Sequence, residues 1–291
     1  MGDRLTVYQS IAALAYAVNA TCFAYWCEQD SPSRFYSWME LSKRMRYPTS
    51  LVILSKTEFL ERTAGMDELG YEGGLLPATL AYDGVYTLAI KTMILPANVT
   101  PCTQPQFEAA YKAIGGDWGM IADVGVLPGR YIALHIRGGD KIAHRDYHYT
   151  VGKSSSFYCT REILQKIEQE ETVPVVLISD DPLSKRLVLS EFGHVFTVVN
   201  GRGLTKLQQE MRDMSILLNA DAIIQESPNG WSAFSSFAAM ARGIPLLNTW
   251  RQGDSLLDRF AANGGKPWEL MTCDSMDMFT SLALRHYKTP L

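Results

Sequence analysis

The stretch YIALHIRGGDK, which runs from Tyr131 to Lys141, decides the expected fold. Its first six residues are apolar or aromatic except for His135, and a short run of this kind is typical of a strand buried on both faces. A charged, glycine-containing segment follows at once. In open α/β sheets, ligands bind at the carboxyl ends of such strands. The stretch predicts either a ligand-binding strand end or, equally well, an ordinary strand and glycine turn in which Arg137 pairs with Asp140.

Helical and strand-like segments alternate after this strand. The hydrophobic patterns predict strands over residues 173–178, 195–199, 222–225 and 244–248, and helices over residues 156–169, 183–192, 207–218 and 232–241. This alternation is typical of a parallel, doubly wound α/β sheet. Acidic and polar residues follow several of the strands directly, so we expect them to share one edge of the sheet.

The first half of the chain has a less regular pattern. It predicts helices over residues 8–18, 35–41 and 107–114, strands over residues 22–26, 50–54 and 87–95, and a glycine-rich loop over residues 70–77. The strand that should precede Gly2 in a βαβ unit is absent, so either the fold begins unusually or the chain is a module of a larger protein. The glycine-containing segment 117–130 separates the two halves. We therefore expect two domains, residues 1–125 and 126–291.

Composition and charge narrow the class of protein. The chain has 47% hydrophobic and 20% charged residues, as globular proteins do, and no run long and apolar enough to span a membrane. Its formal net charge of −4 argues against general nucleic-acid binding, because a phosphate backbone attracts a basic face. No secretory signal or zinc-like cysteine spacing is visible, so we expect five reduced thiols and a cytoplasmic location. The NxT sequons at Asn19 and Asn98 have a meaning only in a secreted chain.

Two further ligand sites are expected at strand ends. Asp180 and Asp181 follow a predicted strand, where carboxylates can accept hydrogen bonds from a ribose or a base, although Asp is an equally good helix N-cap. Asn229 to Ser232 open a helix, whose free N–H groups and partial positive charge suit a phosphate; capping by Ser232 is the alternative. Arg137 can bind phosphate through two parallel hydrogen bonds. Together these residues predict a nucleoside diphosphate bound to the second domain.

Several segments resemble known sequence motifs. HIRGGDK, the strand ending SDD and the block 213–247 are similar to the three peptide motifs of the fucosyltransferase superfamily, which includes α1,2-, α1,6- and protein O-fucosyltransferases. The first motif of that family has the form HxRRxD, and Lys141 matches the lysine that follows it in the α1,6 branch. The opening GDRL, with Ser10 and Leu14, resembles the family's N-terminal glycine-rich loop and helix. Residues 28–125 contribute little to the resemblance.

The resemblance implies a GT-B fold, in which two Rossmann-like domains face a cleft, the C-terminal one holding a nucleotide sugar and the N-terminal one lying on the acceptor side. It also implies an inverting, metal-independent glycosyltransferase without a cofactor, which transfers L-fucose from GDP-fucose to a glycan hydroxyl. Arg137 would bind the β-phosphate and stabilise the charge that develops there. Gly138 replaces the family's second arginine. This difference leaves open a weaker donor site, another donor such as GDP-rhamnose or UDP-xylose, or a nucleotide-sugar-binding protein without catalysis.

The match also implies the site residues. The expected catalytic residues are Arg137 and, as the base for the acceptor hydroxyl, Asp3 or Asp146; His144 and His148 are more typical of a solvated loop, and some relatives have no obvious base. The expected donor contacts are Gly2, Arg4, His135, Arg137, Gly138, Lys141, Asp180, Asp181, Gly230, Trp231 and Ser232. A dinucleotide oxidoreductase is disfavoured, because no GxGxxG follows a strand at the start of either domain.

Overall fold

The computed structural model of the chain divides into two compact units. Unit 1 comprises Met1–Ala122 with Phe260–Pro267, and unit 2 comprises Asp123–Arg259 with Trp268–Leu291. The structure describes residues 2–25, 43–65, 68–72, 85–89, 103–120, 127, 129–137, 155–170, 173–198, 204–226, 232–249, 270–271 and 276–285. The expected domain roles, acceptor side for residues 1–125 and donor side for residues 126–291, stay predictions.

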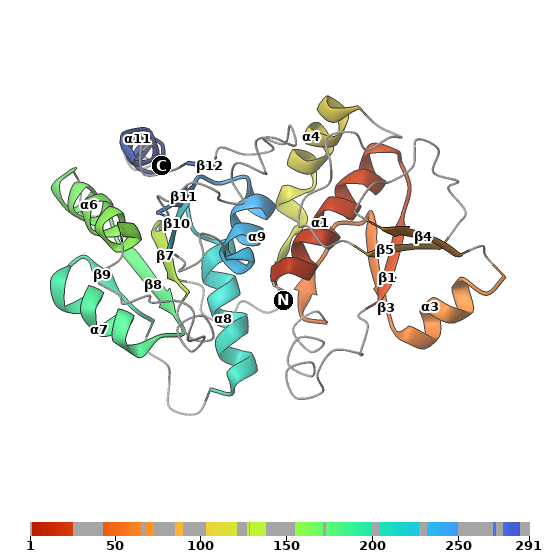
Figure 1. Cartoon of the computed structure of the whole chain (residues 1–291), viewed down its shortest axis with the longest axis horizontal. Coiled ribbons are helices and arrows are strands. Elements are labelled where there is room, and N and C mark those ends of the chain that lie inside the picture. The colour runs from red at the N-terminus through yellow and green to blue at the C-terminus, as the bar shows by residue number, and fades with distance from the viewer. Residues whose placement is uncertain are drawn as a thin grey trace. The chain divides into compact units, whose positions relative to one another are not determined.

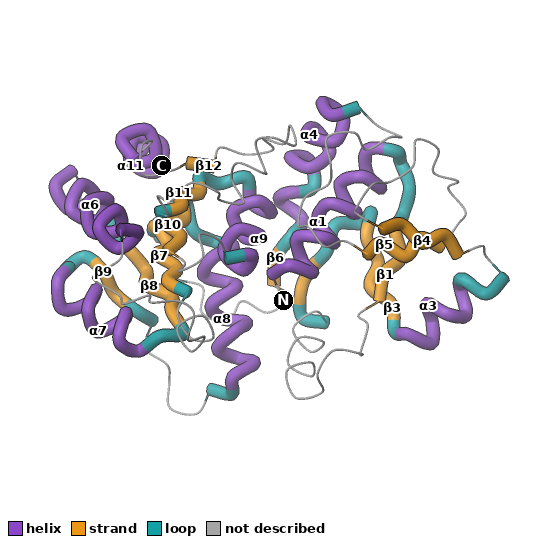
Figure 2. Tube along the Cα trace, in the orientation of Figure 1, coloured by secondary structure: helices purple, strands orange, loops and turns teal. Residues whose placement is uncertain are grey.

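Six strands form the central sheet of unit 2 (Figures 1 and 2), in the order β12-β11-β10-β7-β8-β9. The strands are β7 (Ile132–Ile136), β8 (Val175–Ser179), β9 (Val195–Phe196), β10 (Ala222–Glu226), β11 (Leu246–Asn248) and β12 (Leu270–Met271). Every neighbouring pair is parallel. The predicted parallel, doubly wound sheet is therefore confirmed, although β9 is shorter than the strand predicted over residues 195–199.

The three central strands are buried along their whole length. All residues of β7, β8 and β10 are buried, as expected for parallel strands that helices cover on both faces. Ile132, Leu134 and Ile136 of β7 belong to one hydrophobic core. Burying a side chain of this size contributes about 1.5–3 kcal/mol. The prediction that the stretch from Tyr131 forms a strand buried on both faces is confirmed.

Helices cover both faces of the sheet, and Figure 1 shows α6 and α7 on one side and α8 and α9 on the other. The helices of unit 2 are α6 (Ser155–Glu170), α7 (Pro182–Glu191), α8 (Lys206–Leu218), α9 (Ala233–Arg242) and α11 (Met276–Arg285). Side chains of α6, α7 and α11 share the core formed by Ile132 and its neighbours. Helices α8 and α9 pack against each other, and α9 also packs against β10.

Unit 1 contains a long helix and two pairs of parallel strands. Its elements are α1 (Gly2–Ala17), β1 (Cys22–Tyr25), β2 (Met45–Arg46), β3 (Leu51–Leu54), α3 (Lys56–Arg62), β4 (Glu68–Glu72), β5 (Val85–Ala89), α4 (Gln104–Ala113) and β6 (Gly119–Met120). Strand β1 pairs with β3 and β4 with β5, in parallel, whereas β2 and β6 are antiparallel. Helix α1 packs against α4 and β3, and the Ser50 hydroxyl donates to the Ala12 carbonyl at 2.9 Å.

Two predictions about unit 1 are wrong. The loop expected at Gly2, Asp3 and Arg4 is the first turn of α1, since these residues are already helical. The first three residues of the glycine-rich loop expected over residues 70–77 belong instead to β4, which extends to Glu72, and residues 73–77 lie outside the described residues. The helix expected near residues 35–41 and the end of the strand expected over residues 87–95 lie outside the described residues.

Helices α1 and α9 end in the same left-handed turn. Asn19 after α1 and Gly243 after α9 have φ angles of 54° and 63°. In each case the following residue donates back to the helix: Ala20 N to Ala15 O at 2.8 Å, and Ile244 N to Ala239 O at 3.1 Å. This pattern is the Schellman motif, which satisfies the last free carbonyl groups of a helix. No helix within the described ranges is long and apolar enough to cross a bilayer.

Candidate functional site

The order of the strands changes direction between β7 and β10. Strands β8 and β9 follow on one side of β7, whereas β10, β11 and β12 follow on the other. The helices that come after the two central strands lie on opposite faces: α6 after β7 and α9 after β10. In open α/β sheets, ligands bind outside the carboxyl ends of two strands arranged in this way. The topology alone therefore marks the ends of β7 and β10 as the candidate site.

The central strands β7, β8 and β10 end in the same register. Ile136 pairs with Ser179 of β8 on one side and with Glu226 of β10 on the other. The backbone N–H of Arg137 donates to the Glu226 carbonyl oxygen at 2.9 Å. The neighbouring strand thus fixes the backbone of Arg137, the first residue after β7.

His135 is buried one residue before the end of β7, with 7% of its surface exposed. Burial lowers the pKa of His135 to about 4, because charging a buried imidazole is costly; the Asp180 carboxylate raises this pKa and the Arg137 guanidinium lowers it. His135 is consequently neutral at pH 7. Arg137 and Asp180 directly follow β7 and β8, whose last residues Ile136 and Ser179 pair, so both belong to the same edge of the sheet as His135.

A buried polar network connects this strand end to α9. The Nδ1 atom of His135 lies 2.7 Å from Ser235 Oγ. The Gln225 amide nitrogen donates toward Ser235 Oγ at 2.7 Å, Ser236 Oγ at 2.8 Å and the Ser232 carbonyl at 2.8 Å. These contacts fix the first turn of α9 against the ends of β7 and β10.

Ser232 is the N-cap residue of α9, yet its side chain makes no capping hydrogen bond. The hydroxyl oxygen is buried and has no hydrogen-bond partner among the residues that the structure describes, and the residue is 1% exposed. The capping role considered as an alternative for Ser232 is therefore not observed. A buried polar atom without a partner costs about 1–3 kcal/mol, so a ligand that binds the start of α9 could recover this cost.

Asp181 fills the capping role that the sequence offered as its alternative. Its carboxylate accepts from Leu183 N at 3.3 Å and from Ser184 N at 2.8 Å. Burial alone would raise the pKa of Asp181, but hydrogen bonds from Ser184 and Leu183 hold this pKa below its ordinary value. The neighbouring Asp180 is exposed. Of the two carboxylates, Asp180 is thus the one positioned for a soluble ligand.

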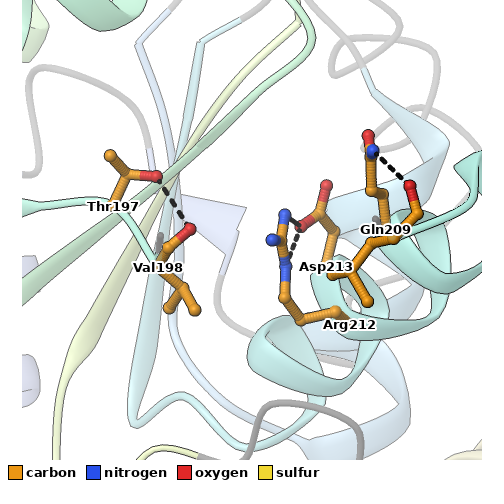
Figure 3. Close-up of polar contacts among 6 residues, drawn as sticks. Thr197, Val198, Gln209, Arg212 and Asp213 are labelled. Atoms are coloured by element: carbon orange, nitrogen blue, oxygen red, sulfur yellow. Dashed lines mark hydrogen bonds and ion pairs between the residues drawn. The ribbon is translucent and has the colours of Figure 1, made fainter. Parts of the chain in front are cut away.

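A third carboxylate, Asp213 on α8, lies near Asp180. Burial raises the pKa of Asp213, hydrogen bonds and charge from Arg212 oppose that change, and the Asp180 charge adds to the rise. Figure 3 shows the Arg212 guanidinium next to this carboxylate, with Nε and Nη2 at 3.0 and 2.6 Å from the same Asp213 oxygen. Asp213 and Asp180 form an acidic group at the carboxyl edge.

The other predicted site residues stay predictions. Gly138, Lys141, Asp146, Gly230 and Trp231 lie outside the described residues. The backbones of Gly2, Asp3 and Arg4 belong to α1 in unit 1. Within the described ranges, no three His, Cys, Asp or Glu side chains are grouped as ligands of one metal ion.

The sequence did not predict four polar residues near the strand ends: Gln225, Glu226, Ser235 and Asp213. Asp213 lies apart from the other three, on α8. The Glu226 carboxylate is fully buried and accepts from Thr160 Oγ1 of α6 at 2.6 Å. Two adjacent polar residues, Gln225 and Glu226, at the end of an otherwise apolar strand are the signal that could have identified them.

Comparison with known proteins identifies the fold. No protein-family model matches the sequence, and no curated protein matches it either. The crystal structure of fucosyltransferase NodZ from Bradyrhizobium is similar with a TM-score of 0.50 and 11% identity, over 81% of this chain and 88% of that chain. A structure of NodZ α-1,6-fucosyltransferase soaked with GDP-fucose covers 83% of this chain and 89% of that chain, with 12% identity and a TM-score of 0.44.

The chain is thus an α/β protein with parallel sheets. More specifically, it has the fold of NodZ, and the expected GT-B fold is confirmed. A sequence identity of 11–12% supports a shared fold and nothing beyond it.

Proposed function

We propose that this protein is an inverting, metal-independent glycosyltransferase that transfers a sugar from a GDP-sugar, with GDP-fucose the first choice, to a hydroxyl of a glycan. One observation carries the proposal: in a GT-B fold, Arg137 follows β7, Asp180 follows β8, and His135 contacts the first turn of α9, all at the carboxyl edge of the sheet beside the switch between β7 and β10. The NodZ structures obtained with GDP-fucose and GDP agree with a donor of this class.

The diphosphate of the donor is assigned to Arg137 and the start of α9. A guanidinium can hold two phosphate oxygens at once. The N–H groups of the first turn of α9 and the Ser232 hydroxyl, which has no partner among the described residues, are suited to the remaining oxygens. Lys141 and the segment Gly230–Trp231 are further donor contacts on this proposal.

The base of the nucleotide is assigned to Asp213 and Asp180. Guanine presents N–H donors at N1 and at its exocyclic amine, which match the acceptor oxygens of a carboxylate. Uracil offers a single N–H between two carbonyl oxygens, which two carboxylates would repel. The acidic group therefore favours GDP over UDP as the nucleotide.

The reaction follows from this placement. The acceptor oxygen attacks the anomeric carbon opposite the diphosphate, a new glycosidic bond forms, and the bond between that carbon and the β-phosphate oxygen breaks. Negative charge grows on the leaving GDP, where Arg137 and α9 stabilise it more in the transition state than in the bound donor. The acceptor proton passes to a base, for which Asp3 and Asp146 are the candidates, or to water. Residues 1–125 supply the acceptor side.

The proposal is tested first by binding. Melting temperatures are measured with GDP, UDP, GDP-fucose, GDP-rhamnose and UDP-xylose, because a ligand that binds only the folded protein stabilises it by about 2.7 kcal/mol at a concentration 100 times its Kd. We expect GDP and GDP-fucose to raise the melting temperature and UDP to leave it unchanged. Failure of every nucleotide to do so would overturn the proposal.

Turnover is tested second, by following GDP release from the stabilising donor in the presence of a panel of glycans. Release that depends on an acceptor supports a transferase. A protein that binds GDP-fucose but releases no GDP with any acceptor would instead be a nucleotide-sugar-binding protein, which Gly138 in place of an arginine would explain.

A further inference from the structure

Two features outside the nucleotide site concern the compartment in which the chain matures. Cys159 is disulfide-bonded, so the expectation of a reduced thiol is wrong for this residue. Cys22 is a free thiol, so the partner of Cys159 lies outside the described residues. Cys159 is fully buried in the core of unit 2. Disulfides form and persist in oxidising compartments and are rare in the cytosol.

The second feature is the sequon Asn19-Ala20-Thr21. Asn19 and Thr21 are both exposed, in the turn between α1 and β1. The left-handed conformation of Asn19 belongs to the Schellman turn described above, and an asparagine there is explained by that turn. Its side-chain amide makes no hydrogen bond, however, and neither does the Thr21 hydroxyl within the described part of the chain. The fold uses the backbone of Asn19 but neither polar side chain.

A second Asn-Ala-X segment shows what a purely structural asparagine looks like. Asn219 follows α8 in the segment Asn219-Ala220-Asp221, which is not a sequon. Its amide nitrogen donates to the Ser215 carbonyl at 2.8 Å and so caps the helix. Asp221 accepts a hydrogen bond from the backbone N–H of Tyr131 at 3.2 Å. Both polar side chains of this segment are used by the fold, in contrast to those of Asn19 and Thr21.

We infer that the chain matures in an oxidising secretory compartment and carries an N-linked oligosaccharide on Asn19. The disulfide and the sequon are independent observations that require the same compartment. The inference does not depend on the proposed transferase activity. Glycosylation of this exposed turn would add a bulky, solubilising group without burying any polar atom.

Glycosylation of Asn19 and oxidation of Cys159 each need a second reactant. The Asn19 amide nitrogen forms a bond to the anomeric carbon of a lipid-diphosphate-linked oligosaccharide, the bond from that carbon to the diphosphate breaks, the amide loses one proton and the lipid diphosphate leaves. Cys159 and its partner together give two electrons and two protons to a disulfide-carrying oxidoreductase.

The inference is tested on the chain isolated from the cells that make it, without reductant. Peptide mass spectrometry with and without peptide N-glycosidase is expected to find the oligosaccharide on the Asn19 peptide. Cys159 is expected to resist alkylation until the protein is unfolded and reduced. An unmodified Asn19 peptide, or Cys159 that is alkylated after unfolding alone, would overturn the inference. A glycan on Asn98 alone would overturn the assignment to Asn19.

Matched variants secreted from cultured eukaryotic cells separate the modification from the fold. Thr21→Ala and Asn19→Gly are expected to lose the glycan while folding normally, because glycine suits the left-handed turn at least as well as asparagine. Thr21→Ser is expected to keep it. Asn219→Gly is the control and is expected to leave the mass of the glycan unchanged. Loss of the glycan mass in Asn219→Gly, or its retention in Thr21→Ala, would contradict the assignment.

Discussion

The Nδ1 atom of His135 lies 2.7 Å from the Oγ atom of Ser235, so β7 and the first turn of α9 share a hydrogen bond. Because Ser235 Oγ also receives an N–H from Gln225, it can donate its own proton to Nδ1. The neutral ring then carries its proton on Nε2. His135 therefore fixes the first turn of α9 through Nδ1 and offers an N–H donor at Nε2. Such a donor at the strand end is suited to an anionic ligand.

Arg137→Ala is expected to lower the rate of sugar transfer by about 100- to 1,000-fold, as does loss of other groups that stabilise a developing negative charge. The melting temperature should not change. Arg137→Lys should recover part of the rate, since lysine keeps the charge but not the paired hydrogen bonds. Arg242→Ala, at the exposed C-terminal end of α9, is the control. Near-normal turnover of Arg137→Ala would refute the role.

Asp213→Asn is expected to weaken GDP binding by about 10- to 100-fold, because hydrogen bonds to a charged acceptor contribute about 1.5–3 kcal/mol. Binding of inorganic pyrophosphate should be unchanged, since it lacks the base. Calorimetry measures both affinities. Asp277→Asn removes an exposed carboxylate of α11 that pairs with Lys166, and should alter neither. Equal loss of GDP and pyrophosphate affinity would contradict base recognition by Asp213.

Stability should fall as the pH decreases from about 6.5 to about 4, through His135. The unfolded chain binds a proton at the ordinary histidine pKa of about 6.5, whereas burial lowers the folded pKa to about 4. The stabilisation is complete above pH 6.5 and is lost through this window, by on the order of 3 kcal/mol. Urea unfolding of the natural protein and of His135→Asn at several pH values measures this component. Identical pH profiles for the two proteins would show that His135 is not buried in its neutral form.

Gln225→Met is expected to lower the free energy of unfolding by about 3 kcal/mol, because it removes the hydrogen bonds that Gln225 makes with buried groups of Ser232, Ser235 and Asn248. Weaker GDP binding should accompany this change as the start of α9 loosens. Leu246→Met is a buried, volume-conserving control and should cost less than about 1.5 kcal/mol. Equal unfolding energies for the two variants would contradict the importance of the network.

Gly243→Ala is expected to destabilise the protein by about 1–2 kcal/mol, because an alanine is strained at a φ of 63°. The matched control is Gly193→Ala, where the φ angle is not left-handed and no atom lies within 4 Å of the added methyl group. That control should be neutral or slightly stabilising. Urea unfolding measures the free energy of unfolding of both variants. Equal free energies would argue against a left-handed conformation at Gly243.

Local patterns were sufficient to predict the sheet but not the network within it. Apolar runs identified β7, β8 and β10, because each is buried on both faces and carries its signal within five residues. His135, Gln225 and Ser235 become neighbours only through the pairing of β7 with β10, which no local pattern contains. Their partnership could therefore not be predicted from the sequence.

The two acidic positions illustrate a different difficulty. For Asp181 the sequence allowed a ligand contact or a helix cap, and only the geometry shows that its oxygens bind Leu183 N and Ser184 N. Asp213 lies on a regular helix, where a carboxylate looks like an ordinary exposed residue until α8 is placed beside the end of β8. The opening at Gly2 was predicted as a loop by resemblance, although nothing in its composition prevents a helix.

The pairing of β10 with β7 also determines the order in which the nascent chain can fold. Strands β7, β8 and β9 emerge from the ribosome first, and until β10 follows, one edge of β7 has no strand beside it. An open, apolar edge is prone to pair with other chains. Fragments that end before Ala222 should therefore aggregate, and chaperone assistance is needed most in the interval before β10 arrives.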